Sequence, residues 1–105
     1  MPFSPMYRTQ TGPAWTPTVT YDNGLPAPIT GATAFILNIK DTNTLIDRTG
    51  GGSVVINNGA LGQITYTWGA TDTSTVSTFL LQFQWTDAAG KIVFSDPISW
   101  VVKPI

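Results

Sequence analysis

The clearest pattern in the chain is the alternation of large apolar and polar residues along two stretches of its second half. In the first stretch, Ile64, Tyr66 and Trp68 alternate with polar neighbours, and in the second the odd positions over 79–85 are all large and apolar. Because side chains of a strand point alternately to its two faces, this spacing predicts two strands, each with one buried face. The polar segment 69–77 between them is too long for a tight hairpin. We therefore expect the chain to cross there from one sheet of a sandwich to the other.

The same alternation predicts a strand over 14–21, a second over 34–40 and a last one over 98–103. Pro17 has no N–H to donate to a neighbouring strand, so the first of these strands is expected at the edge of a sheet. Shorter apolar runs between turn residues predict three more strands, at 44–47, 53–56 and 91–95. Short strands at this spacing predict an all-β sandwich of about seven to nine antiparallel strands.

The N-terminal residues show no such period, so we expect an extended N-terminal arm over 1–12 and one sandwich domain over 13–105. The arm nevertheless contains Phe3, Met6 and Tyr7, and disordered segments are generally poor in aromatic residues. The arm is therefore expected to contact its own domain or a neighbouring subunit. Burying these three side chains does not by itself offset the entropy lost by ordering the arm. We expect the segment from Met1 to Gln10 to be mobile in an isolated subunit and ordered by a neighbouring chain.

Charged residues are few and nearly balanced, with five basic residues against six aspartates and a net charge of −1. They are spread singly, so the chain has neither the basic stripe typical of nucleic-acid binding nor a polybasic patch for an anionic membrane. No apolar stretch approaches the roughly 18 residues of a membrane span, and the N-terminus lacks the pattern of a signal peptide. We expect a protein that is made in the cytoplasm and binds neither nucleic acid nor membrane.

Histidine, cysteine and glutamate are absent, and these residue types carry out much of the acid–base and nucleophilic catalysis near neutral pH. The aspartates all lie at or beside predicted turns, where an Asp side chain accepts hydrogen bonds from nearby backbone N–H groups. Neither Asp41-Thr42-Asn43 nor Asp22-Asn23 has the spacing of a calcium loop. We therefore expect no enzyme activity, no metal and no cofactor.

Apolar side chains remain as candidates for binding another molecule. Tryptophans can stack on sugar rings, and the chain has four of them, Trp15, Trp68, Trp85 and Trp100. Each is in phase with the apolar positions of its own strand, which favours core packing. Other apolar residues lie on the polar face of their strands and are better candidates for a subunit contact. With the three residues of the arm, the candidate partner-binding residues are Phe3, Met6, Tyr7, Ile36, Leu80 and Val101.

Several short motifs occur in a characteristic order from Thr11 onward. They are Thr11-Gly12-Pro13, Thr18-Val19-Thr20-Tyr21-Asp22-Asn23-Gly24, Ile29-Thr30-Gly31-Ala32-Thr33, Gly62-Gln63-Ile64-Thr65-Tyr66-Thr67-Trp68 with Asp72-Thr73, and Phe79, Phe83 and Trp85-Thr86-Asp87 with Gly90-Lys91. In this order the chain resembles the immunoglobulin-like domain of tailed-phage baseplate upper proteins and related phage structural proteins. Ser77 and Phe79 stand where the family has Gly and Tyr, so the hydroxyl bond of a corner tyrosine is not expected at that position. The strand after Gly31 is one residue longer than in the family, which predicts a bulge at 32–34.

The resemblance implies a non-enzymatic virion protein with an immunoglobulin-like β-sandwich. Its expected partners are other virion proteins of the tail or baseplate, and it is expected as a homo-oligomer or in symmetric copies. Two alternatives stay open, a decoration protein of the phage head or neck and a carbohydrate-binding module that recognises a host-surface glycan. The second alternative requires at least two of the four tryptophans to be exposed side by side.

Overall fold

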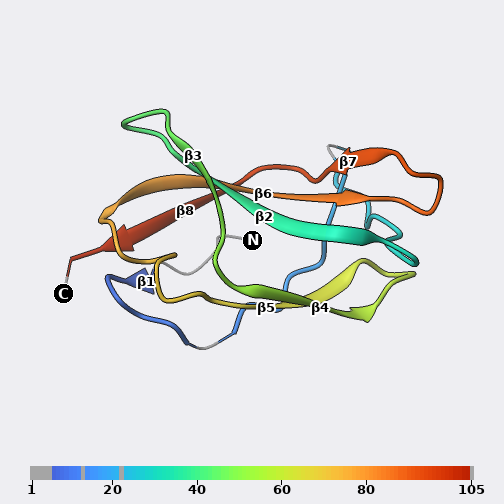
Figure 1. Cartoon of the computed structure of the whole chain (residues 1–105), viewed down its shortest axis with the longest axis horizontal. Helices are drawn as coiled ribbons and strands as arrows, with labels where there is room; N and C mark the ends of the chain where they lie inside the picture. The colour runs from blue at the N-terminus through green and yellow to red at the C-terminus, as the bar shows by residue number, and fades with distance from the viewer. Residues whose placement is uncertain (1–5, 13, 22, 105) are drawn as a thin grey trace.

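The computed structural model describes residues 6–12, 14–21 and 23–104, and within them the chain is all-β, with strands and no helix. The strands are β1 (Met6–Tyr7), β2 (Thr33–Asp41), β3 (Asp47–Thr49), β4 (Ser53–Asn58), β5 (Gln63–Thr67), β6 (Ser77–Thr86), β7 (Ile92–Phe94) and β8 (Ile98–Lys103). They are arranged in two layers along the long axis of the molecule (Figure 1). The predicted all-β class is confirmed.

The larger layer is a six-stranded sheet in the order β1-β8-β6-β2-β3, with β7 paired to β6 as well. Strand β6 is its centre, because β2 pairs along one of its edges while β8 and β7 share the other. The pairs are antiparallel except for β1 and β8, which run parallel with Met6 opposite Val102. The expectation of a wholly antiparallel sandwich is therefore wrong at this one pair.

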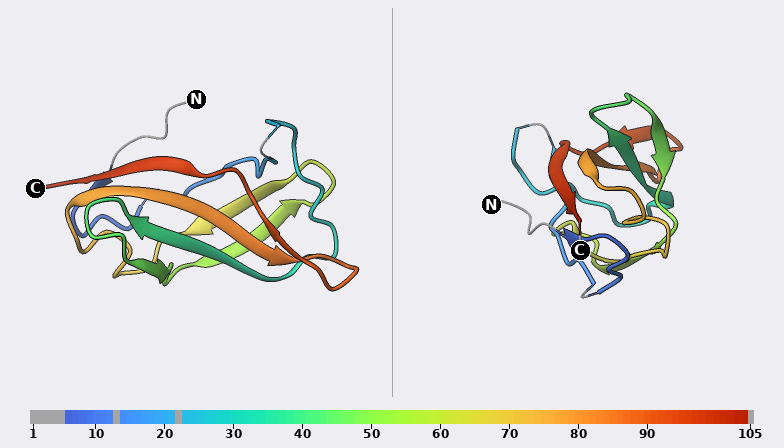
Figure 2. Two further views of the ribbon diagram at one scale, coloured as in Figure 1. Left: turned by 90° about the horizontal axis from the view of Figure 1, so that it is seen from above. Right: turned by 90° about the vertical axis from the view of Figure 1, so that its left-hand side faces the viewer.

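The smaller layer consists of β4 and β5, and the segment 15–19 lies along the free edge of β5 (Figure 2). That segment was expected to be a regular strand, but it forms only isolated bridges, at Trp15 and Thr18. Pro17 explains the interruption because it lies between the two bridges and has no N–H to donate. Its carbonyl oxygen still accepts a hydrogen bond from the Ile64 N–H at 3.2 Å.

The predicted crossing between layers is confirmed, since β5 ends in the small sheet and β6 begins in the large one. The faces predicted to be buried meet between the two layers. The most deeply buried large side chains there are Tyr66, Trp85, Trp100, Phe79, Phe83, Ile64, Leu37, Ile39 and Leu81. The core is therefore built from the alternating positions that the sequence marks.

Two local expectations about β2 and its hairpin have different outcomes. The bulge predicted at 32–34 is confirmed, because the register of β2 against β6 shifts between Thr33 and Ile36, and Ala34 has a φ of 51°. The strand expected over 44–47 instead begins at Asp47. Asp41 causes the difference, since its carboxylate accepts the backbone N–H groups of Asn43 at 2.8 Å and Thr44 at 3.4 Å and so closes a turn there.

The N-terminal segment from Met6 onward is part of the sandwich rather than a separate arm. Met6 is 5% exposed and belongs to the core, and the Arg8 N–H donates to the Lys103 carbonyl oxygen at 2.8 Å. The hydroxyl of Thr73 also donates to the Gln10 carbonyl oxygen at 2.8 Å. Residues 6–10 therefore contact their own domain, one of the two placements expected for the arm, while its ordering by a neighbouring chain stays a prediction. Its first five residues lie outside the described part of the chain.

Candidate functional site

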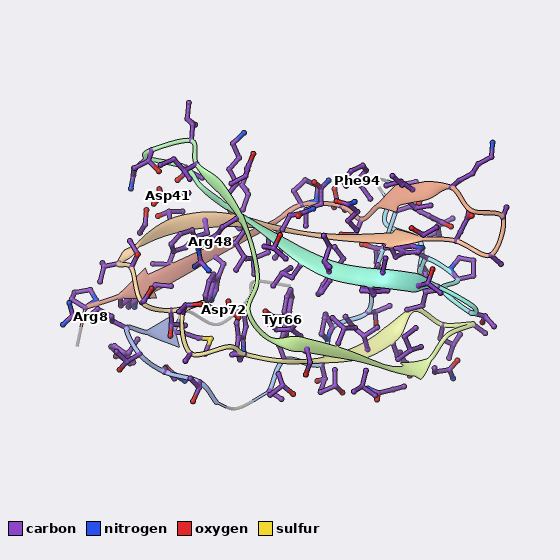
Figure 3. The ribbon with its side chains drawn as sticks, viewed as in Figure 1. Arg8, Asp41, Arg48, Tyr66, Asp72 and Phe94 are labelled. Atoms are coloured by element: carbon purple, nitrogen blue, oxygen red, sulfur yellow. The ribbon has the colours of Figure 1, made fainter. Side chains whose placement is uncertain are left out.

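The most elaborate polar arrangement in the structure surrounds Asp72, at the start of the crossing segment (Figure 3). The Asp72 side chain is completely buried, and its Oδ2 accepts the Tyr66 hydroxyl at 2.6 Å and the Gly69 N–H at 2.9 Å. Its Oδ1 accepts the Gly51 N–H at 2.7 Å, and Arg48 Nη1 lies 3.5 Å from the same oxygen. Arg48 Nη2 donates to the Asp72 backbone oxygen at 2.6 Å. We call these five residues, Arg48, Gly51, Tyr66, Gly69 and Asp72, the Asp72 clamp.

The chemistry of the Asp72 clamp is that of a structural joint. A buried carboxylate is tolerated only when hydrogen-bond donors and a cation compensate it, and here both are present. Burial, followed by the hydrogen bond to Asp72, raises the pKa of Tyr66 well above its usual value. The phenol therefore remains a proton donor near neutral pH. The clamp joins β3, the glycine loop after it, β5 and the crossing segment, so it holds the crossing in place.

Tyr66 and Asp72 both belong to the sequence motifs, but no local pattern predicts that they bond to each other. The corner-tyrosine bond was expected to be missing, because Phe79 occupies the corner position. The structure shows a hydroxyl bond made at this crossing by Tyr66, which lies at the end of the preceding strand, and Tyr66 also accepts the Gly52 N–H at 3.0 Å. The sequence did contain one signal for a bonded turn at Asp72. Gly69 lies between Tyr66 and Asp72, and a glycine followed by an Asp is typical of a turn in which the Asp side chain accepts a backbone N–H.

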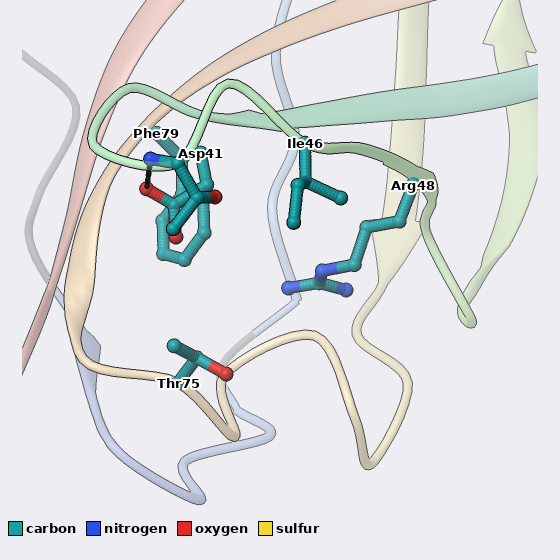
Figure 4. A pocket seen from close by; sticks show the side chains of 6 residues that line it. Asp41, Ile46, Arg48, Thr75 and Phe79 are labelled. Atoms are coloured by element: carbon teal, nitrogen blue, oxygen red, sulfur yellow. Dashed lines mark hydrogen bonds between the residues drawn. The ribbon is translucent and has the colours of Figure 1, made fainter.

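A pocket of about 270 Å³ lies beside the Asp72 clamp, between the β2–β3 hairpin and the crossing segment (Figure 4). Its lining residues are Asp41, Thr44, Ile46, Arg48, Thr75 and Phe79. The Arg48 guanidinium carbon is 5.7 Å from the centre of the Phe79 ring. The backbone N–H of Asn43, followed by the Ser77 hydroxyl, holds the pKa of Asp41 below its usual value, so this carboxylate stays ionised. The two charged groups of the pocket are both bonded within the fold, and the lining contains no nucleophile paired with a base.

The tryptophans are used for packing between the layers, as their phase predicts. Trp68, Trp85 and Trp100 are at most 5% exposed, and Trp15 is half-buried. Trp68 stacks on Trp100 with 4.8 Å between ring centres, and Trp15 stacks on Trp68 at 5.8 Å. The prediction that the tryptophans are mostly buried is confirmed. The pair of exposed neighbouring tryptophans that a sugar platform requires is not formed by these four residues.

The predicted wrong-face residues Ile36, Leu80 and Val101 lie on the outer face of the six-stranded sheet. The strand register shows this. Val101 is opposite Thr78, and Thr78 lies two positions before Leu80 in β6, so Val101 and Leu80 point to the same face of the sheet. Ile36 and Leu80 are half-buried by their neighbours and Val101 is 38% exposed. The structure thus brings these three candidates to one surface, with Ile36 on β2, Leu80 on β6 and Val101 on β8.

Two further apolar side chains on this outer face were missed by the sequence analysis. Ile92 is 63% exposed and Phe94 is 50% exposed, and β7 places them opposite Thr86 and Gln84. Figure 3 shows Phe94 on the side of the large sheet away from β4 and β5. Their spacing of two was visible in the sequence, but a run of three residues is too short to tell an inner from an outer face. We call Ile36, Leu80, Ile92, Phe94 and Val101 the outer apolar face.

The polar groups between these side chains include amides that bond within the fold. Asn38 Nδ2 donates to Gln84 Oε1 at 3.0 Å, and Gln82 Nε2 donates to the Ser95 carbonyl oxygen at 3.0 Å. Charged residues occur toward one end of the face, where Lys40 lies opposite Asp47. The outer apolar face is therefore a weakly charged surface whose amides are already paired.

The three candidates of the N-terminal arm are separated by the structure. Met6 is in the core of its own domain and Tyr7 is 56% exposed, so only Tyr7 presents its side chain to solvent. Phe3 lies outside the described residues. The proposed role of Met6 in binding a partner stays a prediction, although its side chain is covered by its own sheet.

Among the described residues, no cluster of three or more His, Cys, Asp or Glu side chains could hold a metal ion. The described chain also contains no helix that could span a membrane. Comparison with protein-family models found none that matches, and searches of curated proteins and of solved structures likewise found no match.

Proposed function

We propose that this chain is an immunoglobulin-like structural module of a tailed-phage particle, which attaches to other virion proteins of the tail or baseplate. The motif order from Thr11 to Lys91 supports the family. The strand order supports the immunoglobulin-like arrangement, in which one sheet has the order C-F-G and the other contains B-E-D. Strands β2, β6 and β8 lie side by side in the order expected for C, F and G. Segment 15–19, β5 and β4 lie side by side in the order expected for B, E and D.

The connections agree with that arrangement as well. The chain passes from segment 15–19 to β2, from β3 to β4 and from β5 to β6 between the two sheets, whereas β4 and β5 are consecutive and paired. Strand β3 then takes the place of the extra strand that variable-type domains add beside C. One family feature is replaced, because the corner hydroxyl bond comes from Tyr66.

The outer apolar face is the observation that carries attachment to another protein. Ile92 and Phe94 expose neighbouring large apolar groups at one end of this sheet surface, and Val101 exposes another six positions further along β6. An exposed apolar cluster such as that of Ile92 and Phe94 is typical of a protein-binding site. Two of the amides around them, Asn38 and Gln84, are bonded to each other, and Gln82 donates to the Ser95 carbonyl oxygen, so covering the face does not strip these donors of their partners. A head or neck decoration protein would use the same face, and the partner decides between these roles.

Labelling of purified phage particles with an antibody against this chain tests the proposal. We expect electron micrographs to show the label at the tail or baseplate. Label on the head or neck would support decoration instead, and particles that lack the chain altogether would contradict a virion role.

A pair of matched variants tests the attachment face. Phe94→Ser should reduce incorporation into particles, because it removes the most prominent aromatic group of the outer apolar face. Leu25→Ser is the control, since Leu25 is similarly exposed, at 60%, but lies in the turn before β2. Equal incorporation of both variants would show that the face is not used.

A further inference from the structure

Strand β4 is the longest strand in the described chain that has a partner on one side only. It has six residues and pairs with β5, whereas the other single-sided strands, β1, β3 and β7, have two or three residues. In Figure 1 it runs along the side of the molecule opposite the six-stranded sheet. A strand in this position offers a row of backbone groups to another chain.

The hydrogen bonds of β5 show which groups of β4 are open. Ile64 and Tyr66 bond through their backbone to segment 15–19, on the side away from β4. Backbone groups of a strand alternate in direction, so Val54 and Ile56, which lie opposite Tyr66 and Ile64, turn their N–H and C=O groups away from β5. Among the described residues these groups have no backbone partner.

Strand β4 lacks most of the usual protection of an edge strand. Natural edges are blunted by charged side chains, by proline, by shortness or by β-bulges, and of these β4 has only a register shift between Ile56 and Asn58, at its C-terminal end. Strand β4 reads Ser-Val-Val-Ile-Asn-Asn, without charge or proline, and its Val55 and Ile56 are 58% and 37% exposed. The edge strand β3, by contrast, contains Asp47 and Arg48 within its three residues.

We propose that β4 pairs with β4 of a second copy of this chain, antiparallel about a two-fold axis at Val55. In this register the backbone groups of Val54 bond to those of Ile56 in the partner copy, and the reverse. The two Val55 side chains then face each other as a non-hydrogen-bonded pair, with their Cα atoms about 4.5 Å apart. The pairing satisfies every open backbone group of Val54 and Ile56 and joins the two small sheets into one.

A second copy fits this edge because an uncharged strand brings no like charges together when it meets itself, and the whole chain carries a net charge of only −1. An isologous contact of this kind also closes on itself as a dimer. A six-residue edge buries less than the roughly 1,200 Å² of a standard interface, so the dimer is weak and reversible in dilute solution. The pairing uses the small sheet, opposite the outer apolar face, and so does not depend on the virion role.

Sedimentation equilibrium of the full chain over a wide concentration range tests the pairing. We expect reversible dimers at high concentration, and Val55→Lys should weaken the association roughly tenfold or more, because two lysines would meet at the axis. Thr67→Lys is the matched control with the same added charge on the same face, one strand further from the edge. A wild-type chain that stays monomeric at millimolar concentration, or equal effects of both variants, would overturn the proposal.

Cross-linking tests the register, because the chain contains no cysteine and a single introduced thiol is therefore unambiguous. Val55→Cys should form a disulfide-linked dimer on mild oxidation, since about 4.5 Å between Cα atoms lies within the range for a disulfide. Thr67→Cys should remain monomeric, because the proposed dimer separates the two copies of this position by about three strand spacings across the sheet and about four residues along it, roughly 20 Å in all. Equal cross-linking of both variants would mean random collision and would overturn the proposed register.

Discussion

At the scale of single residues, the buried contact between Tyr66 and Asp72 has the most direct energetic consequence. Tyr66→Phe removes the hydroxyl that donates to Asp72 and accepts from Gly52, and leaves a buried carboxylate with one donor fewer. We expect the free energy of unfolding to fall by about 1–3 kcal/mol, the range for a buried group that loses its partner. Urea denaturation measures it, and Tyr7→Phe is the control because Tyr7 is exposed. Equal midpoints for the two variants would contradict the role of the clamp.

The same tyrosine makes stability depend on alkaline pH. Its pKa is raised in the folded state, from an ordinary value of 10.0, mainly by burial and then by Asp72. Above pH 10 the unfolded chain therefore releases the Tyr66 proton while the folded chain keeps it, so stability falls as pH rises. The contribution is complete below the unfolded pKa and is lost progressively above it. Tyr66→Phe should flatten the fall in unfolding free energy above pH 10, and an unchanged profile would show that another group causes it.

Residue patterns predict which side chains are buried better than they predict polar contacts. The alternation marks Leu37, Phe83 and Trp85 as core correctly, because burial follows from the period of a strand and needs no partner to be known. The bond between Tyr66 and Asp72 depends on how the crossing folds back, which no local period describes. Charge and turn preference place Asp72 near a turn, but only the three-dimensional path brings Arg48 to it.

At the scale of elements, the N-terminal strand β1 shows where local reasoning fails. The segment has no period of its own, so its place beside β8 comes from tertiary contacts: the edge of the large sheet, the core around Met6 and the crossing segment at Thr73. The energetic balance that predicted mobility required backbone bonds in addition to apolar burial and assigned them to a neighbouring chain. In the structure Arg8 and Thr9 make such bonds within the same chain, to Lys103 and Thr73.

A pair of neighbouring substitutions tests whether β1 contributes to folding. Met6→Ala removes a side chain that is 5% exposed and should lower the free energy of unfolding by about 2–5 kcal/mol. Tyr7→Ala, at the adjacent and exposed position, should change it by no more than about 0.5 kcal/mol. Chemical denaturation of both variants measures the difference. If Met6→Ala unfolds with a wild-type midpoint, β1 does not pack as described.

Strand positions follow the sequence closely except where a side chain bonds to nearby backbone or a proline intervenes. Strands β2, β6 and β8 fall where alternation predicts them, while β3 begins later because Asp41 closes a turn before it. Segment 15–19 is interrupted at Pro17. In both cases a single residue, Asp41 or Pro17, prevents the backbone next to it from forming regular hydrogen bonds between strands. The residue at which the strand then begins depends on tertiary contacts.

At the scale of the whole molecule, the two sheets are held together by aromatic side chains from both layers. Trp68 follows β5 in the small sheet and stacks on Trp100 of β8 in the large one, with 17° between the ring planes. The rings of Tyr66 and Trp68 are nearly perpendicular, with 5.0 Å between their centres. Trp68 thus connects the small sheet to both the Asp72 clamp and the large sheet, so its loss affects the contact between layers.

Trp68→Ala should therefore destabilise the whole domain rather than one strand. Truncation of a large buried aromatic costs about 3–5 kcal/mol, against a typical domain stability of about 5–15 kcal/mol. We expect urea denaturation followed by tryptophan emission and by far-ultraviolet circular dichroism to show one transition at a much lower midpoint, because both sheets lose their common contact together. Thr67→Ala is the control, since Thr67 is the adjacent residue and points to solvent. Two separate transitions in the variant would show that the sheets fold independently, and a midpoint close to the wild type would show that the layers are joined elsewhere.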